Sequence, residues 1–247
     1  TIQNFNFITF FLAAYFLYKG AMLIHEVIHL GKKIKGYRLA FNILFGWPLS
    51  YPAYIYDTHL FHHGKRTYAT KKDPEYKYLP KFSSLLILKT LMTALLLPFF
   101  HLVRFGLLPL LLPFTPKKFK LFILKKASTL VFDASYERPI RSEQKEISQM
   151  LKNDFASALY KLAFFYFIIG GFIPTSAILI TYILISFTSF INMFRALLSH
   201  LYTNSSNDYL SWEDHLLDTA TVSPGFLTNL IFVNGLNFHG IHHMSPE

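Results

Sequence analysis

The stretch His239-Gly-Ile-His242-His243 lies close to the end of this chain and repeats the spacing of an earlier one, His59-Leu-Phe-His62-His63. Ahead of both lies His25-Glu-Val-Ile-His29, so eight of the eleven histidines fall in three short clusters. Residues at positions i, i+3 and i+4 of a helix share one face. Each cluster therefore presents its imidazoles in one direction, and three such faces predict one shared metal centre.

The composition indicates a membrane protein. The chain has 247 residues, of which 52% are hydrophobic, 18% aromatic and only 15% charged. Soluble domains carry about 25% charged residues. This chain has fewer because it contains long uncharged runs, which are typical of membrane proteins. There is no cysteine, which excludes a cysteine-ligated iron–sulfur cluster, a thiolate haem and any disulfide.

The basic residues predict the orientation in the membrane. The net charge is +10, and the basic residues concentrate in Lys32–Arg38, Lys65–Lys81, Lys117–Lys126 and Arg138–Lys145, outside the best spanning runs. Such clusters are typical of the cytoplasmic side of a membrane protein. Nucleic acid would be the alternative partner of a basic chain, but no soluble basic domain is present to bind it. We therefore expect no nucleic-acid partner.

The apolar runs predict an all-α integral membrane protein with both transmembrane and interfacial helices. We expect spans near residues 6–24, 155–173 and 175–196. Residues 162–194 contain no charge, and Gly170, Gly171 and Pro174 interrupt them, so the last two spans should form an antiparallel hairpin joined by a tight turn. This hairpin keeps the three histidine clusters on one, cytoplasmic, face.

Two other apolar stretches, residues 41–56 and 82–114, carry glycine, proline or charged residues at short intervals. A spanning helix needs about 20 apolar residues, and the uncharged pieces between these interruptions are shorter. We therefore predict that both stretches lie at the membrane interface as short helices.

The cluster at residues 25–29 is a literal H-E-x-x-H, the signature of zinc metalloproteases. A protease site would leave the histidines at 59–63 and 239–243 unused, and tetrahedral zinc cannot hold eight imidazoles. Two redox-active metals that prefer octahedral coordination can together bind eight imidazoles, and imidazole is a suitable ligand for iron. The residues thus favour a dinuclear iron site over a membrane zinc protease or a non-catalytic metal site.

The three clusters resemble the histidine boxes of the membrane fatty acid desaturase superfamily. Further segments are similar in kind: Thr70-Lys-Lys-Asp73-Pro74-Glu75, Asn192-x2-Arg195-x4-His200 and Leu216-Leu217-Asp218. The resemblance covers residues 1–247 as one domain. The usual helix before the first box and most of the tail after the third are missing, so we expect a chain truncated at both ends.

The resemblance implies a non-haem di-iron enzyme of lipid metabolism that uses two iron ions and O2 to introduce a double bond into the acyl chain of a fatty acid or lipid. A hydroxylase, ketolase or alkane monooxygenase of the same superfamily would share the ligands. The chain has no G-x-G-x-x-G, cysteine cluster or His-Pro-Gly-Gly segment. We therefore expect a separate electron donor of the ferredoxin or cytochrome b5 type, docking on the basic face.

We expect nine metal ligands and no further catalytic or cofactor-binding residue. The eight box histidines should divide four and four, and His200, at the end of the second hairpin helix, should make one set five; the resemblance supports this. The expected ligands are His25, His29, His59, His62, His63, His200, His239, His242 and His243.

Around these ligands, the acidic residues Glu26, Asp57, Asp73 and Glu75 are candidates to accept the second ring N–H of ligand histidines. We do not expect Glu26 to be a catalytic base. The remaining histidines, His101 and His215, are interpreted as hydrogen-bonded core or interface residues whose removal leaves metal and activity unchanged. Trp47 and Trp212 are interpreted as anchors at the membrane interface.

Overall fold

The structure is a computed structural model that describes residues 6–76, 84–131, 135–140, 144–204, 206 and 208–245. Within these ranges all regular structure is helical, apart from an isolated antiparallel bridge between His200 and Thr219. The all-α prediction is confirmed. Three helical stretches in these ranges are long and apolar enough to cross a membrane: Phe7–Leu30, Ile87–Phe114 and Ser176–Leu198.

The first candidate span carries the first histidine box. It consists of α1 (Phe7–Ala21) and α2 (Leu23–Leu30), and the side chain of Asn6 caps α1 by accepting from two backbone N–H groups. The short helices α3 (Tyr37–Phe41), η2 (Asn42–Gly46) and η3 (Ala53–Tyr56) follow, so residues 41–56 do not cross. The next helix, α4 (His59–His62), carries the second box.

The prediction that residues 82–114 form separate short helices is wrong for the part described, 84–114, whereas their place at the membrane interface stays a prediction. Helix α5 (Ser84–His101) continues through η4 (Leu102–Leu107), α6 (Leu108–Leu111) and η5 (Leu112–Phe114) as one long helical path. Pro98 lies inside α5 without ending it. Arg104 is buried, and its guanidinium lies 2.9 Å from the carboxylate of Asp154. A charge that seemed to interrupt the span is thus neutralised by a residue 50 positions away.

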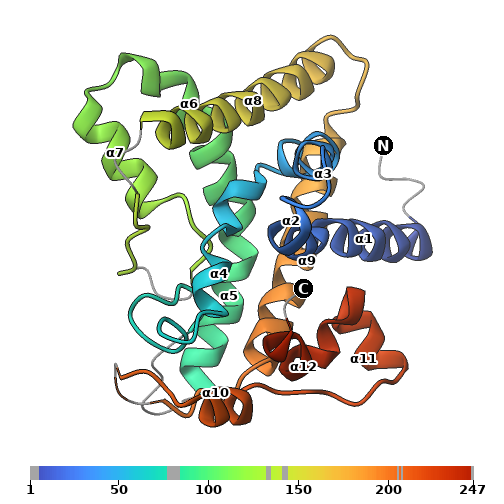
Figure 1. Cartoon of the computed structure of the whole chain (residues 1–247). Coiled ribbons are helices and arrows are strands. Elements are labelled where there is room, and N and C mark those ends of the chain that lie inside the picture. Colours follow the sequence, from blue (N-terminus) through green and yellow to red (C-terminus); the bar gives the residue numbers. More distant parts are fainter. Residues whose placement is uncertain are drawn as a thin grey trace.

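The predicted antiparallel hairpin is only half right. Helices α8 (Gln144–Ile169) and α9 (Ser176–Leu198) are joined by a turn at Gly170 and Gly171, but α8 runs across one end of the molecule and leaves α9. Helix α9 packs instead against α1 and α5, and α5 and α9 run antiparallel to each other (Figure 1).

Polar residues of α8 explain why this helix does not pack against α9. Asn153 accepts hydrogen bonds from Asn42 at 3.0 Å and from the indole of Trp47 at 3.2 Å, and Asp154 accepts one from Tyr54. These bonds fix α8 to the segment between the first two boxes. Trp47 therefore contacts α8, in addition to being a candidate anchor at the membrane interface. Helix α7 (Lys117–Lys126) precedes α8 and runs at a steep angle to it (Figure 1).

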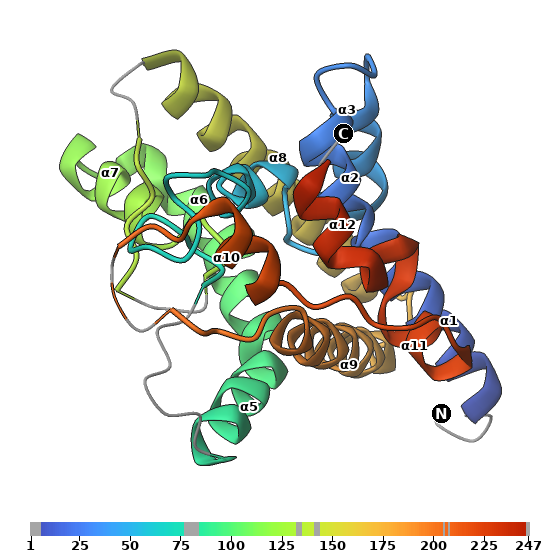
Figure 2. The same cartoon turned by 60° about the horizontal axis from the view of Figure 1, so that its bottom comes forward.

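The C-terminal segment returns to the first box. It comprises α10 (Trp212–Asp218), α11 (Phe226–Ile231), η6 (Val233–Phe238) and α12 (His239–Met244). Figure 2 shows α12 beside α2. The hydroxyl of Tyr18 donates to the carbonyl of Ile231 at 2.6 Å, and Tyr18 packs with Phe232, Val233 and Leu236. This contact holds the third box next to the first.

Candidate metal centre

The structure brings all nine predicted histidines together, from α2, α4, the residues after α9, and α12. They form two groups, in each of which every ligand atom lies within 4.8 Å of every other. One group contains His25, His29, His59, His63 and His242, and the other contains His62, His200, His239 and His243.

The division between the groups differs from the expected one. The box histidines split five and three, and His200 completes the set of four instead of enlarging a set to five. The second and third boxes each contribute to both groups. His59 and His63 are one helical turn apart and point together, whereas His62 points to the other group. Both groups are therefore tied to the same short helices.

The ring nitrogens are spaced as ligands of one metal would be. His200 Nε2 lies 3.0 Å from His62 Nε2 and 2.9 Å from His239 Nε2, and His59 Nε2 lies 3.0 Å from His63 Nε2. Two nitrogens roughly 2.1 Å from a metal are about 3.0 Å apart at right angles and about 3.4 Å apart at the tetrahedral angle. The observed spacing suits octahedral angles.

The tautomers support the same conclusion. His62 Nδ1 lies 2.9 Å from Asp73 and His59 Nδ1 lies 2.6 Å from Glu75, so each Nδ1–H donates to a carboxylate. A neutral imidazole then has a lone pair on Nε2. The Nε2 atoms of His25 and His29 are also buried, with no hydrogen-bond partner among the described residues. Converging lone pairs and unpartnered nitrogens fit a cation.

The carboxylates around the histidines were predicted in three cases of four. Asp73 and Glu75 are the partners of His62 and His59, and Glu26 Oε1 lies 3.3 Å from His25 Nδ1. Asp57 is the exception, because it pairs with arginines, Arg38 at 2.7 Å among them, and contacts no ligand histidine. Its place in the sequence, two residues before the second box, did not reveal those distant cations.

Sequence reasoning missed a buried chain of contacts behind His200. The hydroxyl of Tyr68 donates to Asp218 at 2.6 Å and lies 2.8 Å from His200 Nδ1. Since a hydroxyl has one proton, it accepts the His200 Nδ1–H and leaves Nε2 of His200 facing the other histidines. The 150 positions between Tyr68 and Asp218 left no local signal.

His215 is also closer to the centre than expected. Its Nε2 lies 2.8 Å from His243 Nδ1, and its ring stacks on Tyr68 with centroids 3.6 Å apart. It is thus a buried, hydrogen-bonded residue that contacts a candidate ligand, and the effect of its removal stays a prediction. His101 contacts none of the nine and lines the cavity described below.

Burial keeps most of these imidazoles in the form that binds metals. It lowers the pKa of His59, His200, His239 and His243 well below the usual value, and nearby histidines add to the effect. Neutral imidazole is the metal-binding form. Burial also raises the pKa of Glu75 to about 7.

A largely apolar cavity of about 250 Å³ lies between α1, α5 and α9, and none of the nine histidines lines it directly. Its walls include Met22, Ile24, Leu97, Leu130 and Ile185. At one end lie Tyr56 and Glu75, and both contact His59: the Tyr56 ring stacks on it at 4.5 Å and Glu75 hydrogen-bonds it. The buried Arg195 also lines the cavity and donates to Asn192 at 3.2 Å.

The profile of the fatty acid desaturase family matches residues 3–247. The chain belongs to the fatty acid desaturase family. A protein named ceramide hydroxylase from Caulobacter vibrioides (strain NA1000 / CB15N) is 29% identical over 234 residues, which cover 94% of this chain and 66% of the relative. The chain thus spans slightly less than two thirds of that relative's length. No protein of solved structure matches.

Family membership confirms the resemblance seen in the histidine boxes. With the three candidate spans, it supports an integral membrane protein. The zinc protease interpretation of residues 25–29 loses its support, because both histidines lie against His59, His63 and His242.

Proposed function

We propose that the chain is a di-iron, O2-dependent oxidoreductase that attacks a C–H bond in the acyl chain of a membrane lipid, with hydroxylation as the outcome. The observation that carries the proposal is the apolar cavity whose lining residues Tyr56 and Glu75 both contact His59, one member of the two groups of converging histidines. The relative named ceramide hydroxylase favours hydroxylation. Desaturation, the outcome expected from the boxes, is the second candidate, favoured by the family match.

In this proposal the group of five histidines holds one iron ion and the group of four holds the other. When bound, the irons supply, together with O2, the oxidising power that acid–base groups lack against an alkyl C–H bond. The protein's own part is orientation. Asp73, Glu75 and Tyr68 fix the rings of His62, His59 and His200 so that their Nε2 atoms point inward.

The cavity supports a lipid substrate. Its aliphatic wall suits an alkyl chain and excludes water from the reacting carbon. Polar side chains also line it, among them Thr93, Thr129, Ser189 and Asn192. A lipid with amide and hydroxyl groups near its acyl chain, such as a ceramide, could bind these groups, so we propose a lipid of that class as the substrate.

The proposal also includes the source of the electrons and the side of the membrane on which the histidine boxes lie. A separate protein of the ferredoxin or cytochrome b5 type supplies the electrons, and the histidine boxes face the cytoplasm. The basic segments Lys32–Arg38 and Lys65–Lys81, which adjoin the first two boxes, support this orientation. Cysteines placed singly at Lys71 and at Gly171, in this cysteine-free chain, should label from opposite sides of the membrane, with Lys71 accessible from the cytoplasm. Labelling of Lys71 from outside the cell would contradict it.

Product analysis tests the reaction. The complete protein is expressed in a host that supplies ceramides, and lipids are compared by mass spectrometry with those of a His239→Ala strain. Hydroxylation adds one oxygen atom to the lipid, and desaturation removes two hydrogens. Purified protein should hold about two irons per chain. Unchanged lipids despite full iron, or a single zinc per chain, would overturn the proposal.

A further inference from the structure

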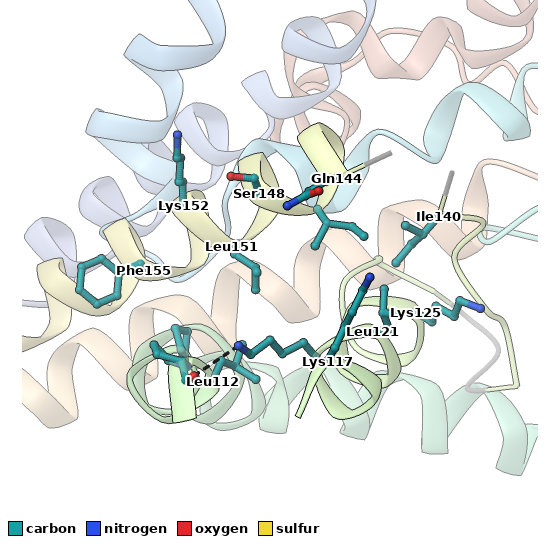
Figure 3. Close-up of a pocket in the computed structure, with 14 residues that line it drawn as sticks. Leu112, Lys117, Leu121, Lys125, Ile140, Gln144, Ser148, Leu151, Lys152 and Phe155 are labelled. Carbon is teal, nitrogen blue, oxygen red and sulfur yellow. Dashed lines mark hydrogen bonds between the residues drawn. The ribbon is translucent and has the colours of Figure 1, made fainter. Parts of the chain in front are cut away.

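A second cavity, of about 850 Å³, lies between α7 and α8 and shares no lining residue with the cavity at the metal centre. Most of its walls come from one face of each helix, and Pro109, Leu112, Pro113 and Ile140 complete them (Figure 3). Lys117, Lys120, Leu121 and Lys125 come from α7 at helical spacing, and Gln144, Ile147, Ser148, Leu151, Lys152 and Phe155 come from α8. Such regular spacing shows that both helices present a continuous face to the cavity.

The polar part of this cavity is cationic. Four of its fourteen lining residues are lysines, and none of the fourteen is acidic. Lys117 extends into the space between the two helices (Figure 3). By contrast Lys126, on another face of α7, pairs with Glu137 at 2.9 Å and does not line the cavity. Lys120 Nζ donates to the carbonyl of Pro113 at 3.3 Å. Lysines without a carboxylate beside them attract an anion, and Gln144 and Ser148 can donate further hydrogen bonds.

The rest of the cavity is apolar. Leu112, Leu121, Ile147, Leu151 and Phe155 line it beside the lysines. A small inorganic anion makes no use of such a surface, whereas a molecule that joins an anionic group to a hydrocarbon chain covers both parts.

The position of the cavity indicates where that molecule comes from. The candidate span Ile87–Phe114 ends at its rim, and Phe114 is 88% exposed. Phe119 and Phe122 of α7 are exposed as well. Basic residues next to the end of a spanning helix, with exposed aromatic rings beside them, are typical of the depth of lipid head groups.

We propose that this cavity binds an anionic membrane phospholipid. Its phosphate lies among Lys117, Lys120 and Lys125, and its acyl chain runs along Leu151 and Phe155. The lipid joins α7 to α8 from outside and thereby supports the end of the molecule opposite the third histidine box. It is not the substrate, because the cavity does not reach the histidines.

Lipid retention in native mass spectrometry tests the proposal, with the full chain purified in detergent. Phosphatidylglycerol is added to wild type, to Lys117→Gln/Lys125→Gln, and to Lys118→Gln/Lys126→Gln. The last variant removes the same charge at the same spacing from the same helix, but neither lysine lines the cavity. We expect the first double variant to bind the lipid on the order of tenfold more weakly or worse, and the control to bind like wild type. Phosphatidylcholine should bind weakly to all three.

A third variant, Ser148→Trp, fills the cavity while keeping every lysine. It should also lose phosphatidylglycerol, which an unspecific attraction between charges would not. Equal binding by all variants, or equal loss in the control pair, would overturn the proposal. So would displacement of the lipid by millimolar inorganic phosphate, which would indicate an anion site. Turnover with the protein electron donor in phosphatidylcholine membranes provides the last arm, because a loss there without lipid binding would assign the lysines to the donor.

Discussion

The two histidine groups differ in how deeply the protein encloses them. All four residues of the His62, His200, His239 and His243 group are buried, whereas three of the other five, His29, His63 and His242, are only half-buried. Their supporting residues differ in the same way. Asp73, behind His62, has no exposed side-chain surface, whereas 36% of the side chain of Glu26, behind His25, is exposed.

The contrast indicates two different strategies for holding a metal. The enclosed group has four donors, and buried partners hold three of them: Asp73 holds His62, Tyr68 holds His200 and His215 holds His243. The open group has five donors with looser support, so it has one ligand to spare. We infer that the loss of one residue should damage the enclosed group more than the open one.

The largest expected effect is on the ligands themselves. His200→Ala removes one of four donors and should lower iron from about two toward one per chain, with turnover reduced at least about 100-fold. His29→Ala leaves four donors in the open group and should retain more iron. Iron analysis of both purified variants, with lipid product counted in parallel, checks the ranking. Full iron and full turnover in His200→Ala would show that His200 is not a ligand, and greater iron loss in His29→Ala would reverse the comparison.

The next effect concerns the carboxylates. Asp73→Asn removes the charge from the buried partner of His62, which also accepts the backbone N–H groups of Ala69 and Glu75. We expect iron affinity to fall about 10- to 100-fold, as for other residues that orient a metal ligand. Competition with a chelator measures it. Glu26→Gln, at the open group, is the matched control, and an equal loss there would remove the distinction between the groups.

A smaller effect is expected from Tyr68→Phe, which breaks the link between Asp218 and His200. Iron affinity should fall about tenfold, because His200 keeps its position in the chain but loses the partner that orients its ring. Tyr202→Phe serves as the control, since that buried hydroxyl donates to the carbonyl of Ala196 and to no ligand histidine. Each variant should cost about 1 kcal/mol of unfolding free energy. If Tyr68→Phe and Tyr202→Phe lost iron equally, the loss would reflect a general weakening of the fold and not the orientation of His200.

The same contrast explains what the sequence could predict. The eight box histidines were found because their spacing along a helix is a local signal, and His200 because it ends an apolar run and matches the family resemblance. Asp73 and Glu75 were found because they follow the second box. The contacts of Tyr68, Asp218 and His215 with the candidate ligands and with one another were missed because they join segments far apart in sequence. How the histidines divide between the groups depends on the relative rotation of α4 and α12, which local spacing does not determine.

In the fold, errors arose where a distant partner changed the meaning of a residue. Arg104 looked like an interruption of residues 82–114, but Asp154 neutralises it inside the protein. Asp154 and Asn153 also bind Tyr54 and Asn42, and these bonds hold α8 away from α9. The uncharged run 162–194 therefore did not form a packed hairpin. Candidate spans depend on which charges find partners, and composition alone does not show that.

The smallest expected effect is that of Glu26→Gln on turnover, and it also separates the proposed enzyme from a zinc protease. Glu26 lies 3.3 Å from His25 Nδ1 at the exposed side of the open group, where glutamine can still accept the same hydrogen bond. Iron should remain bound, and turnover should fall only a few-fold. In a metalloprotease this glutamate would be the general base, and its replacement by glutamine would abolish activity. The decisive measurement is therefore a paired one, iron per chain and lipid product per iron in the same preparation. Complete loss of product with unchanged iron would give Glu26 a catalytic role and make the open group the one less tolerant of substitution.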